Sequence, residues 1–394
     1  MWWKILLALL AIFIIVTLIR AIFYKPKKFE GVKIEDVDID VNKVAEHLSK
    51  AIQCKTISRS NPDDIDWSEF EKFHDFLDEA YPLIKQNTVK ENVSKASLIY
   101  RWKGKNPDLE PMALLSHQDV VPVAEGTEDD WTHDAFSGYN DGEIIWGRGA
   151  LDMKNHLICV MEAVESLMEE GFQPERDVYL CFGHNEEIVC SNESGADEIV
   201  KVLQSRGIHL DSVLDEGSAL LRLDVKGLIH TYIAAVGVAE KGYADMKLTV
   251  HDKGGHTSAA PKHSGMAKLA NTIKDVERHQ FKSHMLPFLT ELFDTVGRKA
   301  TYLGRTVMCN VWLLKPIIKL VLKIIPESAS MVRTIQSISM CEGSPEPNVL
   351  PQRPSITINF RPLPGDTVDD VEKHIRKAVR YKDLEIERLY SKEA

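Results

Sequence analysis

Short apolar runs alternate with amphipathic stretches over the first 220 residues. The runs at 112–115, 178–182 and 212–214 have the composition of buried parallel strands. Residues 152–170 lie between the first two runs. Their apolar side chains recur every three or four positions, which is the pattern of an amphipathic helix. This alternation predicts an α/β fold in which helices cover both faces of a sheet.

Polar residues follow each apolar run. The clusters are Ser116-His117-Gln118-Asp119, Ala150-Leu151-Asp152, His184-Asn185-Glu186-Glu187 and Leu214-Asp215-Glu216. The carboxyl ends of strands form the ligand-binding edge of an open α/β sheet. Acidic and imidazole groups that converge there are costly to bury unless a cation neutralises them. A mixed histidine and carboxylate set favours zinc over calcium, so the sequence predicts a zinc site.

The spacing within the clusters indicates different tasks for neighbouring residues. His117 and Asp119 are two apart and project to the same side of an extended strand, so Asp119 can orient the histidine. Glu186 and Glu187 are adjacent and point in different directions, so one can bind metal while the other acts as a general base. A solvated acidic loop is the ordinary interpretation of one such pair. Four clusters in succession favour a metal-dependent hydrolase.

Longer motifs carry a specific resemblance. Residues 117–122, 146–154 and 183–187 resemble the aminoacylase and carboxypeptidase S group of co-catalytic zinc metallopeptidases, with the closest likeness to its carboxypeptidase S and N-fatty-acyl-amino-acid synthase/hydrolase branches. The resemblance continues through 254–258 and 359–362 and covers roughly residues 45–390. It implies a zinc-exopeptidase-like α/β catalytic domain at 41–235 and an α+β, ferredoxin-like lid and dimerisation domain at 236–394.

The resemblance also implies roles for individual residues. Two zinc ions would be held by His117, Asp152, Glu187 and Asp215, with Asp152 bridging both. Glu186 would be the general base toward a zinc-activated water, and Asp119 would orient the site. The substrate would be an N-acyl amino acid or a peptide C-terminus, cleaved at the amide bond next to a free carboxylate.

Three residues of the expected lid would contact the substrate: His256, Asn348 and Arg361. The resemblance implies that His256 reaches across a homodimer, whereas a turn histidine after two glycines is the simpler interpretation of the residue alone. The fork of an arginine fits a carboxylate. An exposed structural arginine is the alternative for Arg361.

Two departures from the family pattern stand out. Asn185 occupies a position that is usually aspartate, which changes local charge without removing a ligand. The last zinc ligand of the family is a histidine after the lid, and His374 is the last histidine here. We therefore expect the zinc at Glu187 to lack its histidine and to bind weakly, as in a truncated product. The alternative function is a membrane-anchored, catalytically weak fragment that acts through lid-mediated dimerisation.

The N-terminus predicts a membrane segment. Residues 1–24 are apolar over about 20 positions, just long enough to span a bilayer as an uncleaved signal anchor, and 25–40 form a polar linker. Basic residues after the segment favour a cytosolic body. Glycosylation sequons at Asn92 and Asn192 favour a lumenal one. We expect a membrane-anchored or secretory protein with a lumenal or extracellular body.

Composition and charge limit the partners that the chain can be expected to bind. The chain has 394 residues, 48 basic against 59 acidic, and a net charge of −11. It carries no basic stripe with interleaved aromatic residues, so nucleic acid is not an expected partner. Residues 311–326 are apolar with lysines every four positions. They predict either a helix packed on the lid with its lysines outward or an apolar surface for an acyl chain or a membrane.

Overall fold

The computed structural model describes residues 2–26, 37–188, 194–217, 219–324 and 326–394. The chain divides into two compact units at Gly217. We call residues 37–217 the α/β unit, and residues 2–26 together with 219–394 the α+β unit. The domain boundary expected near residue 235 stays a prediction; contacts within the chain group the segment 219–235 with the α+β unit. Most of the expected linker and the second sequon, at Asn192, lie outside the described residues.

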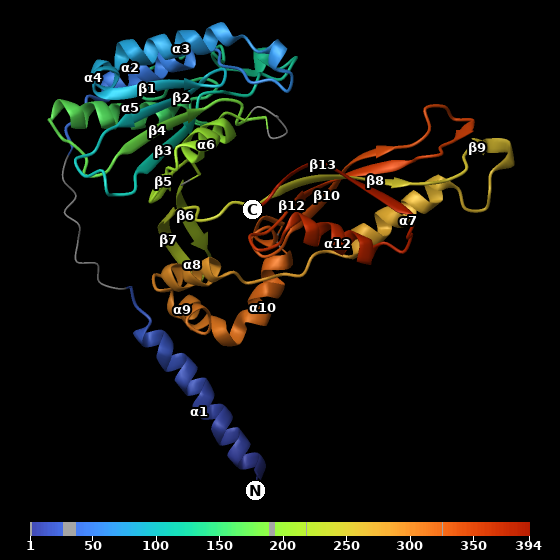
Figure 1. Ribbon diagram of the computed structural model, residues 1–394. Helices are drawn as coiled ribbons and strands as arrows, with labels where there is room; N and C mark the ends of the chain where they lie inside the picture. Colours follow the sequence, from blue (N-terminus) through green and yellow to red (C-terminus); the bar gives the residue numbers. More distant parts are fainter. Residues whose placement is uncertain (1, 27–36, 189–193, 218, 325) are drawn as a thin grey trace. The chain divides into compact units, whose positions relative to one another are not determined.

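A five-stranded sheet forms the centre of the α/β unit, in the order β1-β2-β4-β3-β5 (Figure 1). The strands are β1 (Thr88–Val93), β2 (Ser97–Trp102), β3 (Met112–His117), β4 (Val178–Gly183) and β5 (Ser212–Leu214). β3 runs parallel to β4 and β5, which confirms the three predicted parallel strands, but the expected burial fails at β5, whose three residues are exposed. β1 and β2 add an antiparallel edge to β4.

Helices cover both faces of this sheet, as predicted (Figure 1). On one face pack α2 (Val41–Ile52), α3 (Trp67–Ala80), α4 (Pro82–Asn87) and α5 (Lys154–Glu169). On the other packs α6 (Gly195–Ser205). Strand alternation divides the side chains of β2: Leu98 and Tyr100 point to the first face and Ile99 to the second. Each fully buried side chain of this kind stabilises the fold by about 1.5–3 kcal/mol.

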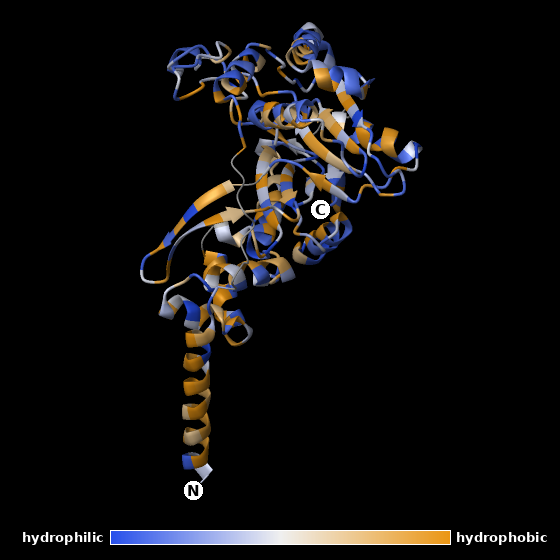
Figure 2. Cartoon of the chain, turned by 90° about the vertical axis from the view of Figure 1, so that its left-hand side faces the viewer, coloured by the Kyte–Doolittle hydropathy of each residue, from blue (hydrophilic) through white to orange (hydrophobic). Residues whose placement is uncertain are grey.

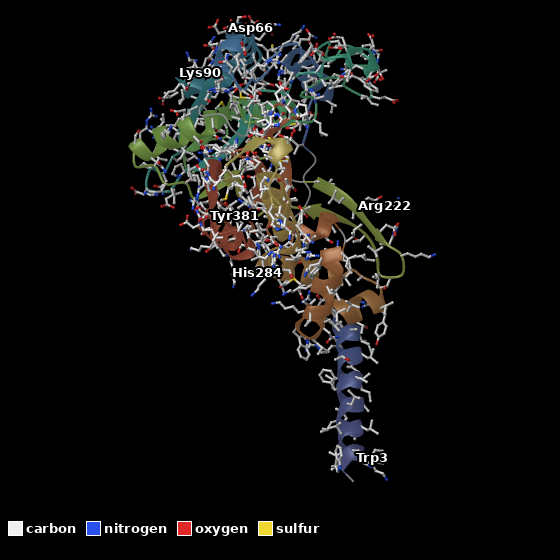
Figure 3. All side chains as sticks on the ribbon, turned by 90° about the vertical axis from the view of Figure 1, so that its right-hand side faces the viewer. Trp3, Asp66, Lys90, Arg222, His284 and Tyr381 are labelled. Atoms are coloured by element: carbon white, nitrogen blue, oxygen red, sulfur yellow. The ribbon has the colours of Figure 1, made fainter. Side chains whose placement is uncertain are left out.

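Short segments complete the α/β unit. The 3-10 helices η1 (Pro62–Asp64) and η2 (Glu128–Asp130) lie in its loops. Asp66 caps the N-terminus of α3: its carboxylate accepts a hydrogen bond from the backbone N–H of Ser68 (Figure 3). This cap satisfies a donor that the first helical turn leaves without a partner.

The α+β unit contains a four-stranded antiparallel sheet in the order β10-β12-β8-β13. The strands are β8 (Tyr243–Val250), β10 (Ile335–Glu342), β12 (Ser355–Arg361) and β13 (Leu384–Lys392), and the helices α7 (Gly265–Arg278) and α12 (Val368–Ala378) pack on the sheet. Apart from the inserted segments, the βαββαβ order is that of a ferredoxin-like fold.

Additional elements are inserted into this pattern. Between α7 and β10 lie α8 (Pro287–Gly297), α9 (Tyr302–Met308), α10 (Val311–Ile324) and α11 (Pro326–Ala329). The antiparallel hairpin of β6 (Ala219–Val225) and β7 (Ile229–Ala235) packs its Ile229 against Val296 of α8. β9 (Gly255–His256) pairs with β11 (Val349–Leu350), and η3 (Thr257–Ala259) follows β9.

The N-terminal helix α1 (Trp2–Phe23) differs from all of these. It is long and apolar enough to cross a membrane. Figure 2 shows it as an almost unbroken hydrophobic rod, and its side chains, including Trp3 near its beginning in Figure 3, stand out from the helix.

Candidate metal centre

The parallel strands of the α/β unit end at one edge of the sheet and carry the predicted residues there. His117 is the last residue of β3, Glu186 and Glu187 follow β4, and Glu216 follows β5. Asp152 enters from the turn before α5. The strands therefore explain why residues 100 positions apart in the sequence meet at one place.

The imidazole of His117 is the centre of the site. Its ring is buried, and Nε2 lies 3.1 Å from Oδ1 of Asp152. The same nitrogen lies 3.8 Å from a carboxylate oxygen of Glu186 and 3.8 Å from one of Glu216. On the other side of the ring, Nδ1 lies 2.9 Å from the carbonyl oxygen of Asp119. Nδ1 is thus held by the backbone, while Nε2 faces the carboxylates, as in a metal-binding histidine.

Three of these side chains satisfy the spacing of a metal site. One ligand atom each from His117, Asp152 and Glu216 lies within 4.8 Å of the others. One imidazole and two carboxylates form a donor set that zinc accepts, with room for a further ligand. The prediction of a metal-type cluster at this edge of the sheet is confirmed at this level.

Asp215, the expected fourth ligand, lies outside that group. Its carboxylate accepts a hydrogen bond from the backbone N–H of Glu216 at 2.9 Å, and its side chain is exposed. Because adjacent residues after a strand point in opposite directions, only one of the pair faces His117. Glu216 was noted in the sequence as part of the pair but was not assigned a role. Only the direction in which the folded chain leaves β5 favours Glu216 over Asp215.

The two carboxylates can be separated by metal titration. We expect Glu216→Gln to weaken zinc binding by more than the roughly 10- to 100-fold that changes outside the ligand shell cost. Asp215→Asn, the matched control, should shift affinity less, because its carboxylate turns back to the backbone. Competition with a chromophoric chelator measures both. A larger loss in Asp215→Asn than in Glu216→Gln would restore Asp215 as the ligand.

Asp119 positions the other groups. Its side chain is fully buried, and its two carboxylate oxygens accept hydrogen bonds from the backbone N–H groups of Glu186 (3.1 Å) and Glu187 (3.2 Å). One oxygen also lies 3.5 Å from Nδ1 of His117. Asn185 stands just before this pair with a φ of 57°, a left-handed conformation that asparagine tolerates. Asp119 thereby ties the end of β3 to the loop after β4.

The protonation of these groups reflects their crowding. Burial alone would raise the pKa of Asp119, but the hydrogen bond and charge of His117 lower it, so the carboxylate stays ionised. Burial likewise opposes protonation of His117, yet the hydrogen bond to Asp119 and the charges of Asp119, Glu186 and Glu216 raise its pKa to about 10. Burial and the charges of neighbouring carboxylates, opposed by His117, raise the pKa of Glu216 to about 7. Such mutual repulsion favours a bound cation.

Glu187 and Glu186 lie at the same edge but differ in exposure. The Glu186 side chain is about half exposed, at 53%. Glu187 is partly buried, and burial followed by the charge of Asp152 raises its pKa. The more open glutamate is thus the one within reach of solvent. Glu187 is not part of the three-residue group, so its role as ligand stays a prediction.

Removing the charge of Asp119 tests its positioning role. We expect Asp119→Asn to weaken zinc affinity about 10- to 100-fold, since groups that orient metal ligands typically contribute that much. Asp78→Asn is a matched control, because it removes ion pairs with Lys90 (2.6 Å) and Lys85 (3.4 Å) and touches none of the site residues. Isothermal titration of zinc into both variants measures the difference. Equal affinities would refute the role of Asp119.

The three substrate-contacting residues expected from the sequence lie in the α+β unit. His256 is exposed on β9, where its Nδ1 lies 2.9 Å from the hydroxyl of Ser258. Asn348 lies beside it, since its carbonyl oxygen accepts the backbone N–H of Thr257 at 3.1 Å. The cleft at this end of the unit is lined by residues that include Gly255, His256, Ser344 and Arg353.

Arg361 is not brought together with those two residues. It ends β12, whereas β11 precedes the beginning of that strand, and seven residues of strand span roughly 20 Å. Its guanidinium lies over the ring of Tyr243 at 4.5 Å, and its Nε lies 3.3 Å from the side-chain oxygen of Asn359. These contacts match the structural role left open in the sequence analysis. Substrate contacts by His256, Asn348 and Arg361 stay predictions.

The sequence that carries this site matches a family of known proteins. The pattern of peptidase family M20/M25/M40 matches residues 113–330, which include every residue of the cluster. The chain belongs to this family. It is 36% identical over 349 residues to a probable carboxypeptidase S-like 2 from Dictyostelium discoideum, covering 88% of the chain and 66% of that protein. It is 30% identical over 356 residues to the N-fatty-acyl-amino acid synthase/hydrolase PM20D1 from Xenopus tropicalis, covering 88% and 67%.

A solved structure supports the fold. An M20 family metallo-carboxypeptidase from Sulfolobus solfataricus superposes with a TM-score of 0.55 at 19% identity, covering 90% of this chain and 79% of the other. These findings confirm the resemblance and the fold class expected from the sequence. The chain spans about two thirds of the length of the curated relatives it matches.

Proposed function

We propose that this chain belongs to a zinc-dependent hydrolase that cleaves an amide bond next to a free carboxylate. The observation that carries the proposal is the His117 imidazole, held at Nδ1 by Asp119 and turned with Nε2 toward Asp152 and Glu216. The names of the relatives, a carboxypeptidase S-like protein and an N-fatty-acyl-amino acid synthase/hydrolase, support peptides or N-acyl amino acids as substrates.

We propose that the site holds two zinc ions. His117, Asp152 and one of the pair Asp215 and Glu216 would hold the first, and Asp152 with Glu187 would hold the second. When bound, the zinc ions would polarise the scissile carbonyl and make a water molecule more acidic. The chain's own residues do the remaining work. His117 and Asp119 fix the position of the ligands, and Asp119 also fixes the backbone from which Glu186 projects.

Glu186 would move the proton. Its carboxylate is half exposed at the edge of the cluster, so it can reach both the attacking water and the leaving amine. It would take a proton from the water as the carbonyl is attacked and would give it to the amine nitrogen as the amide bond breaks. His256 and Asn348 of the α+β unit are proposed to contact the substrate, with His256 supplied by a second copy of the chain.

We further propose that α1 anchors the protein in a membrane, with the body on the lumenal or extracellular side. Its 22 residues match the thickness of a bilayer, and almost all of its apolar side chains are exposed. The sequon at Asn92 is exposed on β1 and is therefore accessible to glycosylation.

A substrate panel tests the hydrolase proposal. We expect zinc-loaded protein to release amine from N-acyl amino acids or dipeptides, and to leave the matching compounds with an amidated carboxylate almost untouched. Dialysis against a chelator should stop the release, and added zinc should restore it. Hydrolysis that continues without metal, or that ignores the carboxylate, would refute the proposal.

A further inference from the structure

Helix α10 exposes an apolar stripe. With a helical period of 3.6, one side of α10 collects Leu313, Ile317, Leu320, Val321 and Ile324, whose exposed fractions run from 40% to 73%. The opposite side carries Lys315, Lys319 and Lys323. The sequence left two interpretations of residues 311–326: a helix packed on the lid, or an apolar surface for an acyl chain or a membrane. The first requires this stripe to be covered. The described residues of the α+β unit leave these five side chains at least 40% exposed.

The same region of the unit packs against α1 through polar groups. The hydroxyl of Tyr302 donates to the carbonyl oxygen of Leu18 at 3.1 Å, and the side-chain amide of Asn310 donates to that of Thr17 at 3.2 Å. In the other direction, Arg20 of α1 donates to the carbonyl oxygen of Cys309 at 3.1 Å. α9 and the start of α10 are therefore attached to the C-terminal third of α1.

Arg20 explains part of this arrangement. It is the charge that interrupts the apolar run of α1, and a charge in a membrane span needs a partner. Its guanidinium lies 5.9 Å from the ring centre of Trp312 and bonds to the carbonyl that follows α9, where the helix dipole is negative. Ala21, beside it, is fully buried. The segment from α9 to the start of α10 thus partners a charge that lipid would disfavour.

The contacts between α1 and α10 also indicate how deep the start of α10 would lie in a membrane. The rings of Phe13 and Trp312 meet edge to face with centroids 6.2 Å apart. Phe13 lies ten residues before Phe23, the end of α1, which is about 15 Å along a helix. In a span that crosses a bilayer core of about 30 Å, that is close to the middle. The start of α10 is therefore level with the hydrocarbon whenever α1 spans it.

We propose that α10 is a second membrane contact, which lies in one leaflet with its apolar stripe among the lipid acyl chains. The inference rests on the proposed anchoring by α1. The contact between α1 and the start of α10 favours lipid as the occupant, because that contact lies at the depth of the hydrocarbon. The lysine face suits anionic headgroups, as in amphipathic helices that lie in a membrane interface. The α+β unit would then be held at the membrane by two elements.

Photolabelling of the full chain tests the proposal. The protein is reconstituted into phosphatidylcholine and phosphatidylserine vesicles that contain a lipid with a diazirine on its acyl chain, and labelled peptides are mapped by mass spectrometry. We expect label on α1 and on the apolar stripe of α10. The exposed face of helix α12, in the same unit, provides the background level.

A pair of variants sharpens the result. Ile317→Ser combined with Leu320→Ser should reduce labelling of α10 to the level of α12, whereas Lys315→Ser, on the opposite side of the helix, should leave it unchanged. Both changes fall on solvent-facing positions of the unit, and circular dichroism checks that the variants are folded. Label retained in the double variant would overturn the proposal.

The other outcomes are distinguishable. Label on α1 with background on α10 would overturn the inference and leave the anchor intact. Background on both would overturn the anchor and the inference together. An α10 that is unlabelled and cross-links to a second copy of the chain would identify a dimer interface in place of a lipid contact. The hydrolase proposal is unaffected by all three.

Discussion

Glu186→Gln is expected to reduce kcat by about 10²- to 10⁴-fold, the usual contribution of a positioned general base. Glutamine keeps the size of the side chain but cannot accept the proton of the attacking water. Zinc content should stay at the wild-type level, because the proposed ligands are unchanged. Hydrolysis of an N-acyl amino acid and elemental analysis of the same sample measure the two quantities together.

The control for this variant is Glu71→Gln, an exposed glutamate on α3. It should retain both rate and metal. Two results would contradict the assignment. An unchanged rate in Glu186→Gln would mean that another group moves the proton. A rate lost together with the metal would make Glu186 a ligand.

The second large effect concerns Asp152. We expect Asp152→Ala to lose zinc from both proposed sites, because its carboxylate is the one ligand that they share, and to lose hydrolysis with it. Wild-type protein should bind one zinc ion tightly and a second only at high metal concentration. Elemental analysis after dialysis measures the stoichiometry, with Asp108→Ala, an exposed surface change, as the control. A variant that retains its zinc would exclude Asp152 as a ligand.

Much of the α/β unit follows from local sequence patterns. The runs at 112–115 and 178–182 are apolar without alternation, as expected for parallel strands with both faces covered, and this made them recognisable, whereas the run at 212–214 is a parallel strand whose side chains are exposed. Polar residues directly after such runs must meet at one edge, so His117 and its acidic neighbours were predictable as a cluster. Asp152 lies in the turn before α5 and follows no strand, so this reasoning does not place it.

The remainder depends on packing that a pattern does not encode. Whether Asp215 or Glu216 turns toward His117 is decided by the path of the chain after a strand of three residues. The antiparallel pairing of β2 with β4 joins segments about 80 positions apart in the chain, so it depends on tertiary contacts. The apolar stripe of α10 has the same sequence period whether a core or lipid covers it, so only the exposed side chains of the folded unit could separate the two.

Anomalous X-ray scattering at the zinc absorption edge tests the central claim most directly. Crystals of zinc-loaded protein should show a strong anomalous peak about 2.0–2.2 Å from Nε2 of His117 and from carboxylate oxygens of Asp152 and Glu216. A second, weaker peak should lie on the Glu187 side of Asp152. No peak beside His117 in crystals soaked at saturating zinc, or a peak bound by other residues alone, would contradict the account.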